Sequence, residues 1–232
     1  MQRNEFNALH MIRQHTCIPT PIPLDVVVMP EDTDDTFDDS SDEPASWLLT
    51  TRVPGIPLWR CIYFLSDSNL AEITEQLKDY ITQLRAIPKI INPEMAISNT
   101  LGEACQDHRL HMREPLGPFV NEEAFNQVVA FSDDPSRRGH QIFFTHADIN
   151  PRNILVAQMD QPDGSKRWRI SGLIDWETAG YYPEYWEYSK SMFEQFRWPD
   201  RYNNMIIDVF KEFGDYSREL ETEMNSWGSW DT

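Results

Sequence analysis

The chain has few cysteines and no long apolar run. Its three cysteines, Cys17, Cys61 and Cys105, are scattered, odd in number and outside any C-x-x-C pattern. This argues against a disulfide framework and favours a reducing compartment. No apolar run approaches the roughly 20 residues that span a bilayer, and the first twenty residues lack the continuous apolar stretch of a signal peptide. We therefore expect a cytoplasmic protein that has no membrane partner.

Basic residues are also scarce, with 20 Lys and Arg against 38 Asp and Glu, for a formal charge of −18. Eight of the acids lie between residues 31 and 43, in EDTDDTFDDSSDE, which is predicted to be a solvated loop between two strands. The acidic surplus outside this loop excludes nucleic acid as a partner, because phosphates would be repelled. A cationic substrate would be attracted, although solubility alone also explains an acidic surface.

Glycine and lysine are absent from the first part of the chain. The first glycine is Gly55 and the first lysine is Lys78. Neither G-x-G-x-x-G nor G-x-x-x-x-G-K-[ST] occurs, so no glycine-rich loop that cradles phosphates is recognisable. The 232 residues are 40% hydrophobic and 12% aromatic, which is sufficient for a packed core.

The first predicted element is a helix over residues 4–15. Glu5, Ala8, Leu9 and Ile12 follow the i, i+3, i+4, i+7 spacing of a single helical face. This spacing puts a carboxylate on the apolar side of the helix, where it requires a partner.

Helices outnumber strands in the rest of the predicted pattern. A second helix starts at Asn69, which has capping-box spacing to Glu72, and Pro88 stops it. A third helix over 121–131 would turn Phe125 and Val128 inward. The remaining predictions are strands at 26–29, 47–53, 141–145, 154–158 and 168–174, helices at 184–196 and 202–213, an irregular stretch at 89–118, and a loosely ordered tail after Glu219.

The stretch THADINPRN, at residues 145–153, carries the clearest chemical signal. Asp148 and Asn153 lie five residues apart between two predicted strands, and 22 residues later another strand ends in LIDWE with Asp175 at its end. Phosphoryl transfer uses such a set: Asp148 would accept the proton of a substrate hydroxyl, while Asn153 and Asp175 would coordinate Mg²⁺. The alternative is an ordinary turn in which Asp148 caps a hairpin.

The motif H-x-D-x4-N followed by I-D-W resembles the aminoglycoside phosphotransferase / choline kinase family, a branch of the protein-kinase-like fold. Four stretches carry the resemblance, at 4–21, 117–126, 145–156 and 172–190, and the last three are similar to a subgroup common in filamentous fungi. The resemblance covers nearly the whole chain. It implies an α+β, two-lobed fold with a reduced N-terminal lobe over 1–57 and a mainly helical C-terminal lobe over 58–232.

The resemblance also implies roles for single residues. Asp148 matches the catalytic base, and His146 matches the loop histidine that braces the catalytic loop. Asn153 and Asp175 match the metal ligands of an ATP- and Mg²⁺-dependent enzyme that phosphorylates a hydroxyl of a small molecule. Glu5 matches the helix-C glutamate, which in this fold pairs with a strand lysine near the nucleotide.

The sequence departs from the family in one respect, because it begins at the helix that carries Glu5. The strand lysine and the phosphate-covering loop would precede that helix, so we expect an N-terminally truncated or degenerate member. The alternative function is a non-catalytic pseudo-kinase remnant that binds a ligand or a protein partner. The acceptor and the oligomeric state have no signal in the sequence.

Two other patterns have weaker functional interpretations. His108 and His111 have i, i+3 spacing but no third ligand nearby, so we expect surface histidines. Asp175 and Glu177 would share a face of one strand, whereas the paired acids of glycosidases usually come from separate elements roughly 5 Å or more apart. No G-x-S-x-G motif indicates an acyl hydrolase.

Overall fold

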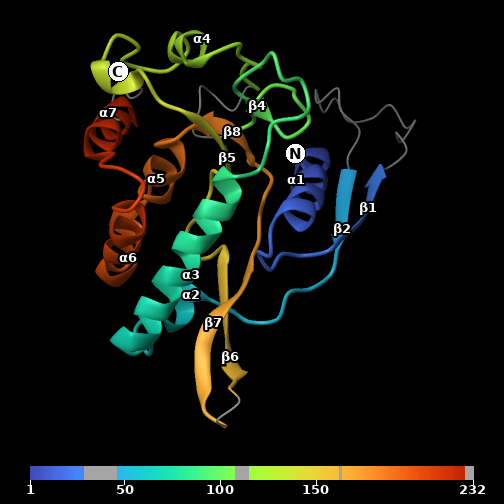
Figure 1. The fold of residues 1–232 in the computed structure, drawn as a ribbon, viewed down its shortest axis with the longest axis vertical. Helices are drawn as coiled ribbons and strands as arrows, with labels where there is room; N and C mark the ends of the chain where they lie inside the picture. The colour runs from blue at the N-terminus through green and yellow to red at the C-terminus, as the bar shows by residue number, and fades with distance from the viewer. Residues whose placement is uncertain (29–45, 108–114, 162–163, 228–232) are drawn as a thin grey trace, which may run out of the picture.

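The computed structural model describes residues 1–28, 46–107, 115–161 and 164–227 (Figure 1). The predicted acidic loop at 31–43 and the pair His108 and His111 lie outside these residues. No helix in the described part of the chain is both long enough and apolar enough to cross a membrane.

The N-terminal part consists of a helix packed on a small sheet. Helix α1, Gln2–His15, contacts the antiparallel strands β1, Pro23–Val28, and β2, Ser46–Thr50. Ala8, Leu9 and Ile12 are buried on the inner face of the helix, as the periodicity predicts. The residues of strands β1 and β2 are mostly exposed; Trp47 on β2, for example, is 67% exposed. The apolar contacts of this part therefore centre on one face of α1.

Two further sheets form the centre of the molecule, and every strand pair in them is antiparallel. One sheet has the order β3-β6-β7 and the other the order β4-β8-β5. The strands are β3, Ile56–Pro57; β4, Ser98–Asn99; β5, Ile142–Thr145; β6, Ile154–Asp160; β7, Lys166–Leu173; and β8, Gly180–Pro183. The chain passes between these two sheets three times: from β3 to β4 through the helical segment between them, and by the shorter crossings from β5 to β6 and from β7 to β8.

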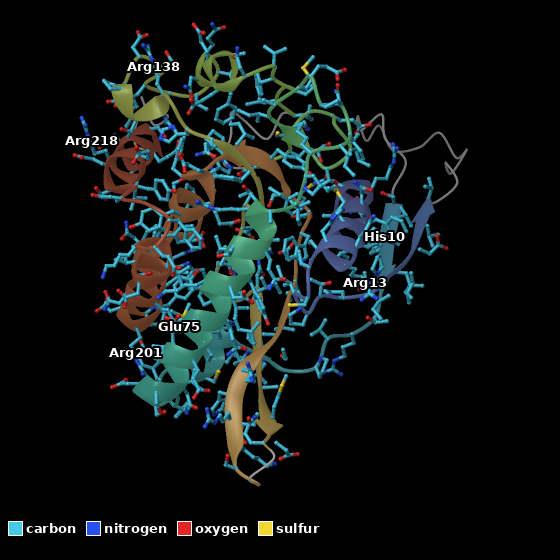
Figure 2. The ribbon with its side chains drawn as sticks, viewed as in Figure 1. His10, Arg13, Glu75, Arg138, Arg201 and Arg218 are labelled. Atoms are coloured by element: carbon cyan, nitrogen blue, oxygen red, sulfur yellow. The ribbon has the colours of Figure 1, made fainter. Side chains whose placement is uncertain are left out.

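Helices cover these sheets and complete the core. The longest, α3, Asp67–Arg85, contacts α6, β5 and β7 (Figure 1). The other helices are α2, Leu58–Cys61; α4, Glu122–Asn126; α5, Trp186–Ser191; α6, Asp200–Phe210; and α7, Ser217–Trp227. The charged side chains of Glu75, Arg138 and Arg218 lie at the exposed periphery (Figure 2).

Three predictions about local structure were wrong. The N-cap of α3 is Ser66 rather than Asn69, because the Ser66 side chain accepts the N–H of Asn69. The helix predicted at 121–131 is the five-residue α4, and Val128 is 39% exposed rather than inward. The apolar spacing that predicted the longer helix continues past Asn126, but the chain there enters turns.

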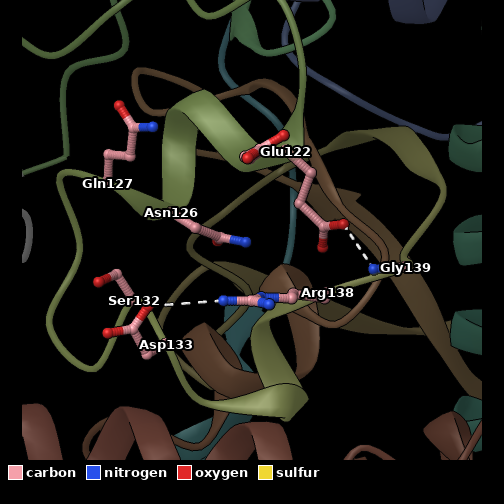
Figure 3. A pocket seen from close by; sticks show the side chains of 8 residues that line it. Glu122, Asn126, Gln127, Ser132, Asp133, Arg138 and Gly139 are labelled. Carbon is pink, nitrogen blue, oxygen red and sulfur yellow. Dashed lines mark hydrogen bonds and ion pairs between the residues drawn. The ribbon is translucent and has the colours of Figure 1, made fainter.

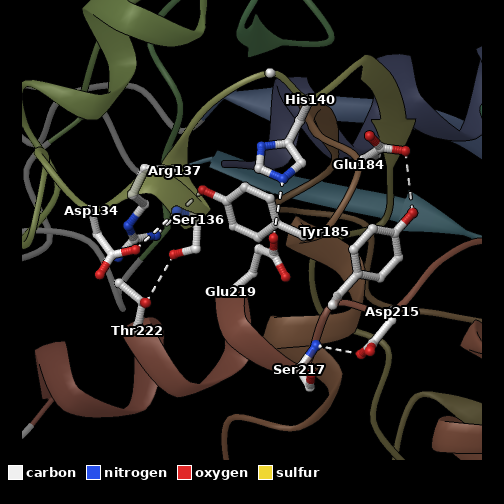
Figure 4. A network of polar contacts seen from close by, with 12 residues as sticks. Asp134, Ser136, Arg137, His140, Glu184, Tyr185, Asp215, Ser217, Glu219 and Thr222 are labelled. Carbon is white, nitrogen blue, oxygen red and sulfur yellow. Dashed lines mark hydrogen bonds and ion pairs between the residues drawn. The ribbon is translucent and has the colours of Figure 1, made fainter.

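Within the described residues, the tail predicted to be loosely ordered after Glu219 is helix α7 as far as Trp227, and residues 228–232 lie outside them. Polar residues hold it: Thr222 bonds Ser136, and Glu223 pairs with the buried Arg137 (Figure 4). Leu220, Met224 and Trp227 do follow the i, i+4, i+7 spacing of a helical face. They are few in a strongly polar segment, and Met224 is 43% exposed, so the apolar spacing does not mark the face that packs.

Candidate active site

The two shorter crossings between the sheets, from β5 to β6 and from β7 to β8, bring Asp148, Asn153 and Asp175 together. Asp148 and Asn153 lie on the crossing from β5 to β6, and Asp175 starts the crossing from β7 to β8. Ile154 pairs with Leu173 in the β6–β7 ladder, and the N–H of Ile174 donates to the carbonyl of Asn153 at 3.1 Å. Asp148 and Asn153, five residues apart, and Asp175, 22 residues further along the chain, therefore lie on two crossings that this hydrogen bond joins.

The Asp148 carboxylate is oriented by two amides. The Nδ2 atoms of Asn153 and Asn150 both donate to Asp148 Oδ2, at 2.9 and 3.1 Å. The same amides donate to the backbone carbonyl of Asp148. No sequence pattern singles out Asn150, because an Asn two residues after an Asp in a loop has many possible roles.

His146 joins the two crossings. Its Nε2 donates to the carbonyl of Ile174 at 3.1 Å, and its Nδ1 accepts the N–H of Asp148 at 3.2 Å. The ring is fully buried and lies 4.2 Å from the ring of Trp176. With both nitrogens bonded to backbone, the imidazole holds the Asp148 loop against the strand end before Asp175.

A buried carboxylate on α5 supports the turn that precedes Asp148. Glu187 accepts the backbone N–H groups of His146, at 2.6 Å, and Ala147, at 3.1 Å. Ala147 has φ 65°, a conformation that a non-glycine residue adopts only when its surroundings hold it there. Burial raises the pKa of Glu187, while the nearby His146 and the backbone N–H groups oppose that shift. No sequence pattern singles out Glu187, because it lies among the aromatic residues of YYPEYWEY, at 181–188.

Asp175 and its neighbours form an acidic edge. Asp175 is exposed and also has a positive φ, of 69°. Burial, followed by the charges of Asp175 and Glu5, raises the pKa of Glu177 to about 6. Mutually repelling carboxylates of this kind favour a bound cation.

The donors present fit a magnesium ion. The Nδ2 of Asn153 is committed to Asp148, which leaves its carbonyl oxygen as the donor for a metal, and Asp175 supplies an exposed carboxylate. Both are the hard oxygen ligands that Mg²⁺ prefers. Among the described residues no three His, Cys, Asp or Glu side chains converge as a metal site. Mg²⁺ is commonly held by one or two protein oxygens together with substrate phosphates, so two ligands suffice.

Glu5, predicted to need a partner, finds it in the backbone. Its Oε1 accepts the N–H of Trp176 at 3.3 Å, and none of the ion pairs among the described residues involves it. Burial raises the pKa of Glu5, the Trp176 N–H lowers it and the charge of Asp175 raises it. The carboxylate on the apolar face of α1 therefore lies beside the metal-ligand candidate.

A small cavity of about 60 Å³ adjoins Asp148, and Asn150, Arg152, Glu194 and Trp198 are among its lining residues. A larger cavity, of about 440 Å³, lies between α4 and the segment that follows it, lined among others by Glu122, Asn126 and Arg138 (Figure 3). None of the predicted site residues lines the larger cavity.

Comparison with protein families gives a match over residues 2–220 to the phosphotransferase enzyme family, also called APH. The chain belongs to this family. Comparison with curated proteins gives no match. Among solved structures, a thermostable mutant of aminoglycoside phosphotransferase APH(4)-Ia without ligands is similar with a TM-score of 0.58 and 14% identity, covering 95% of this chain and 72% of that one.

A second similar structure is a ternary complex of an APH(4)-Ia mutant with ADP and hygromycin B. Its TM-score is 0.56 at 13% identity, again over 95% of this chain and 72% of that one. At such identities the likeness bears on the fold alone. The predicted α+β, protein-kinase-like fold with a reduced N-terminal part is thereby confirmed.

Proposed function

We propose that this family member transfers the γ-phosphoryl group of ATP to a hydroxyl of a small molecule, with Mg²⁺ as cofactor. The observation that carries the proposal is the hydrogen bond between Ile174 and Asn153, which joins the crossing that holds Asp148 and Asn153 to the one that starts with Asp175. A proton acceptor and two oxygen ligands on neighbouring strand ends suit in-line phosphoryl transfer, where positioning and charge neutralisation dominate.

Each side chain has a specific task in this proposal. Asp148, oriented by Asn150 and Asn153, accepts the proton of the acceptor hydroxyl. Asn153 and Asp175 hold Mg²⁺, which neutralises the charge on the ATP phosphates when it is bound. His146 acts by positioning the loop, because both of its ring nitrogens are engaged by backbone groups.

The division of the chain follows from the same proposal. Residues 1–57 act as the remnant of the N-terminal lobe and residues 58–232 as the C-terminal lobe, with the nucleotide between them near Glu5, Asn153 and Asp175. A cytoplasmic location suits an enzyme that consumes ATP and carries three free cysteines.

The acceptor would enter beside Asp148. The small cavity there is lined by the cations Arg152 and Lys190 as well as by Glu194 and Trp198, and Arg152 already pairs with Glu194 at 3.7 Å and lies over the Trp198 ring at 5.2 Å. Only the strongly acidic charge of the protein as a whole therefore favours a cationic acceptor.

A thermal-shift titration and an ADP-release assay test the proposal together. ATP with Mg²⁺ at about 100 times its Kd should raise the free energy of unfolding by about 2.7 kcal/mol. Asp175→Ala should abolish the Mg²⁺ dependence of this shift, and Asp148→Ala should keep the shift but release no ADP with any of a panel of amino sugars and amino alcohols.

The rival function is a non-catalytic binder. It is favoured by Glu5, which forms no ion pair with a lysine in the described part of the chain. A wild-type chain that neither shifts with ATP and Mg²⁺ nor releases ADP would reject the kinase proposal and leave the non-catalytic binder as the remaining function.

A further inference from the structure

The first turn of α1 is bonded to the backbone of the segment that follows Asp175. The side-chain amide of Asn4 donates from Nδ2 to the carbonyls of Glu177, at 2.8 Å, and Ala179, at 2.9 Å. Glu5, the next residue, accepts the N–H of Trp176. Two adjacent side chains of one helix therefore bind three backbone groups of residues 176–179.

The other side of the Asn4 amide is anchored as firmly. Its Oδ1 accepts hydrogen bonds from the backbone N–H and from the hydroxyl Oγ1–H of Thr100, at 2.9 and 2.7 Å. Thr100 directly follows β4. Asn4 is 6% exposed and Thr100 1% exposed. A buried amide is costly unless its hydrogen bonds are made, and here both Nδ2 donors and the Oδ1 acceptor are used.

Close packing of the strands supports this anchor. A Cβ on Gly180 of β8 would lie 2.6 Å from the carbonyl oxygen of Ser98 on β4, so only glycine allows β4 to approach. The residues after β4 thereby reach Asn4, and the residues before β8 are the ones that Asn4 binds. Asn4 thus joins α1, the turn after β4 and the crossing that starts with Asp175.

Residues 176–179, which Asn4 and Glu5 bind, follow directly after Asp175, whose backbone has a positive φ. Asp175 has φ 69°, a left-handed conformation that Asp adopts more readily than most non-glycine residues but that neighbouring contacts must still favour over an extended or helical one. The hydrogen bonds from α1 are made to Trp176 and Glu177, the two residues immediately after Asp175. They restrain the backbone conformation that aims the Asp175 carboxylate.

We propose that Asn4 and Glu5 are positioning residues that hold residues 176–179 by their backbone and so fix the Asp175 carboxylate for its metal. Glu5 does so as a hydrogen-bond acceptor and needs no lysine for this role. The effect on metal binding rests on the proposed function. The clamp, meaning the hydrogen bonds from Asn4 and Glu5 to the backbone of residues 176–179, does not.

Hydrogen exchange measured by mass spectrometry tests the clamp without any ligand. Asn4→Ala should speed amide exchange in a peptide covering residues 174–180 by about tenfold or more, the factor expected for loss of about 1.4 kcal/mol of local stability. Asn7→Ala is the matched control: Asn7 lies on the same helix and donates to the carbonyl of Thr100 at 2.9 Å, with no bond to residues 176–179. Equal exchange in the two variants would overturn the clamp.

Two variants of Glu5 distinguish its role as a hydrogen-bond acceptor from the effect of its charge. Glu5→Gln keeps an oxygen that accepts the Trp176 N–H, whereas Glu5→Ala does not. The probe is Mn²⁺ in the presence of ADP, with its affinity measured by electron paramagnetic resonance. Glu5→Ala and Asn4→Ala should weaken Mn²⁺ binding about tenfold, and Glu5→Gln should stay within about threefold of wild type.

Each remaining outcome also decides something. A Glu5→Gln chain as weak as Glu5→Ala would show that the charge matters and reject the acceptor role. A wild-type chain that binds no Mn²⁺ with ADP would reject the proposed function and the effect on metal binding, while the exchange data still judge the clamp. Because Glu5 is only partly buried, the Glu5 variants keep the experiment decisive if Asn4→Ala fails to fold.

Discussion

The carboxylate of Glu187 accepts the backbone N–H of His146 at 2.6 Å, although 41 residues separate them in sequence. The second bond, from the N–H of Ala147, fixes a residue whose φ is 65°. Glu187 is buried on α5, so the start of the Asp148 loop is attached to the helical core and not only to its flanking strands. Loss of this attachment should affect both stability and activity.

We expect Glu187→Ala to lower the free energy of unfolding by about 2–4 kcal/mol, because two buried N–H groups lose a charged acceptor. Urea unfolding followed by Trp fluorescence measures this loss. Glu184→Ala is the control, since Glu184 accepts bonds from Gln141 and Tyr216 and has no contact with the loop. A loss for Glu187→Ala no larger than for Glu184→Ala would show that the attachment adds no stability.

Asp148→Asn should reduce kcat by about 10²–10⁴-fold, the usual contribution of a general base. The substitution preserves size and leaves Oδ1 or Nδ2 to face Asn150 and Asn153, so nucleotide affinity should change little. Steady-state ADP release with the best acceptor of the panel gives kcat, and a thermal-shift titration gives nucleotide affinity. Unchanged kcat would remove Asp148 from the mechanism.

The central motif was predictable because its signals are short-range. Strand patterns on both sides of THADINPRN place Asp148 and Asn153 in one loop, and a strand ends just before Asp175, as the structure has it. The supporting residues were not predictable in this way. Asn4 and Glu187 are polar residues in helical segments, and what they bind is decided by chain crossings that no local pattern encodes.

Helix α7 is a part of the fold that the local sequence pattern likewise did not predict. Its buried residues include the polar Thr222, Glu223 and Ser226, whereas the apolar Met224 is 43% exposed, so apolar spacing does not identify the face that packs, as it does for α1 and α3. The partners of this face, Ser136 and Arg137, lie more than 80 residues earlier in the chain. Polar complementarity between distant segments is a property of the folded structure.

His140 should make stability depend on pH. Its Nδ1 lies 2.6 Å from Glu122 Oε1, and its Nε2 lies 3.4 Å from Glu219 Oε1 (Figure 4). Burial alone would lower the pKa of the imidazole, but the hydrogen bonds and charges of the two carboxylates outweigh it and raise the pKa to about 9. Since the folded pKa exceeds the ordinary value of about 6.5, the contribution is complete below pH 6.5 and is lost as the pH rises through 9.

The size of this contribution is at most about 3–4 kcal/mol, from the rise of the pKa from 6.5 to about 9 at about 1.4 kcal/mol per pKa unit. Unfolding free energies of wild type and His140→Gln at pH 6 and pH 9.5 measure it, because the variant carries no titrating group at this position. The difference between the two proteins should shrink toward pH 9.5. A difference that stays constant over this range would mean that the imidazole holds no extra proton in the folded state.

The buried pair of Arg137 and Glu223 should stabilise the fold only as a pair. Arg137 also donates to Tyr185 Oη at 3.3 Å and to the carbonyl of Ala130 at 3.2 Å, and both charged side chains are almost fully buried. Arg137→Met leaves a buried carboxylate without its cation, so we expect a loss of about 3–5 kcal/mol. The double variant Arg137→Met/Glu223→Leu removes both charges and should recover most of that loss, because desolvation of the two ions is avoided. Urea unfolding of wild type, both single variants and the double variant gives the coupling free energy. A value near zero would mean that the pair adds no stability and that α7 is held by its other contacts.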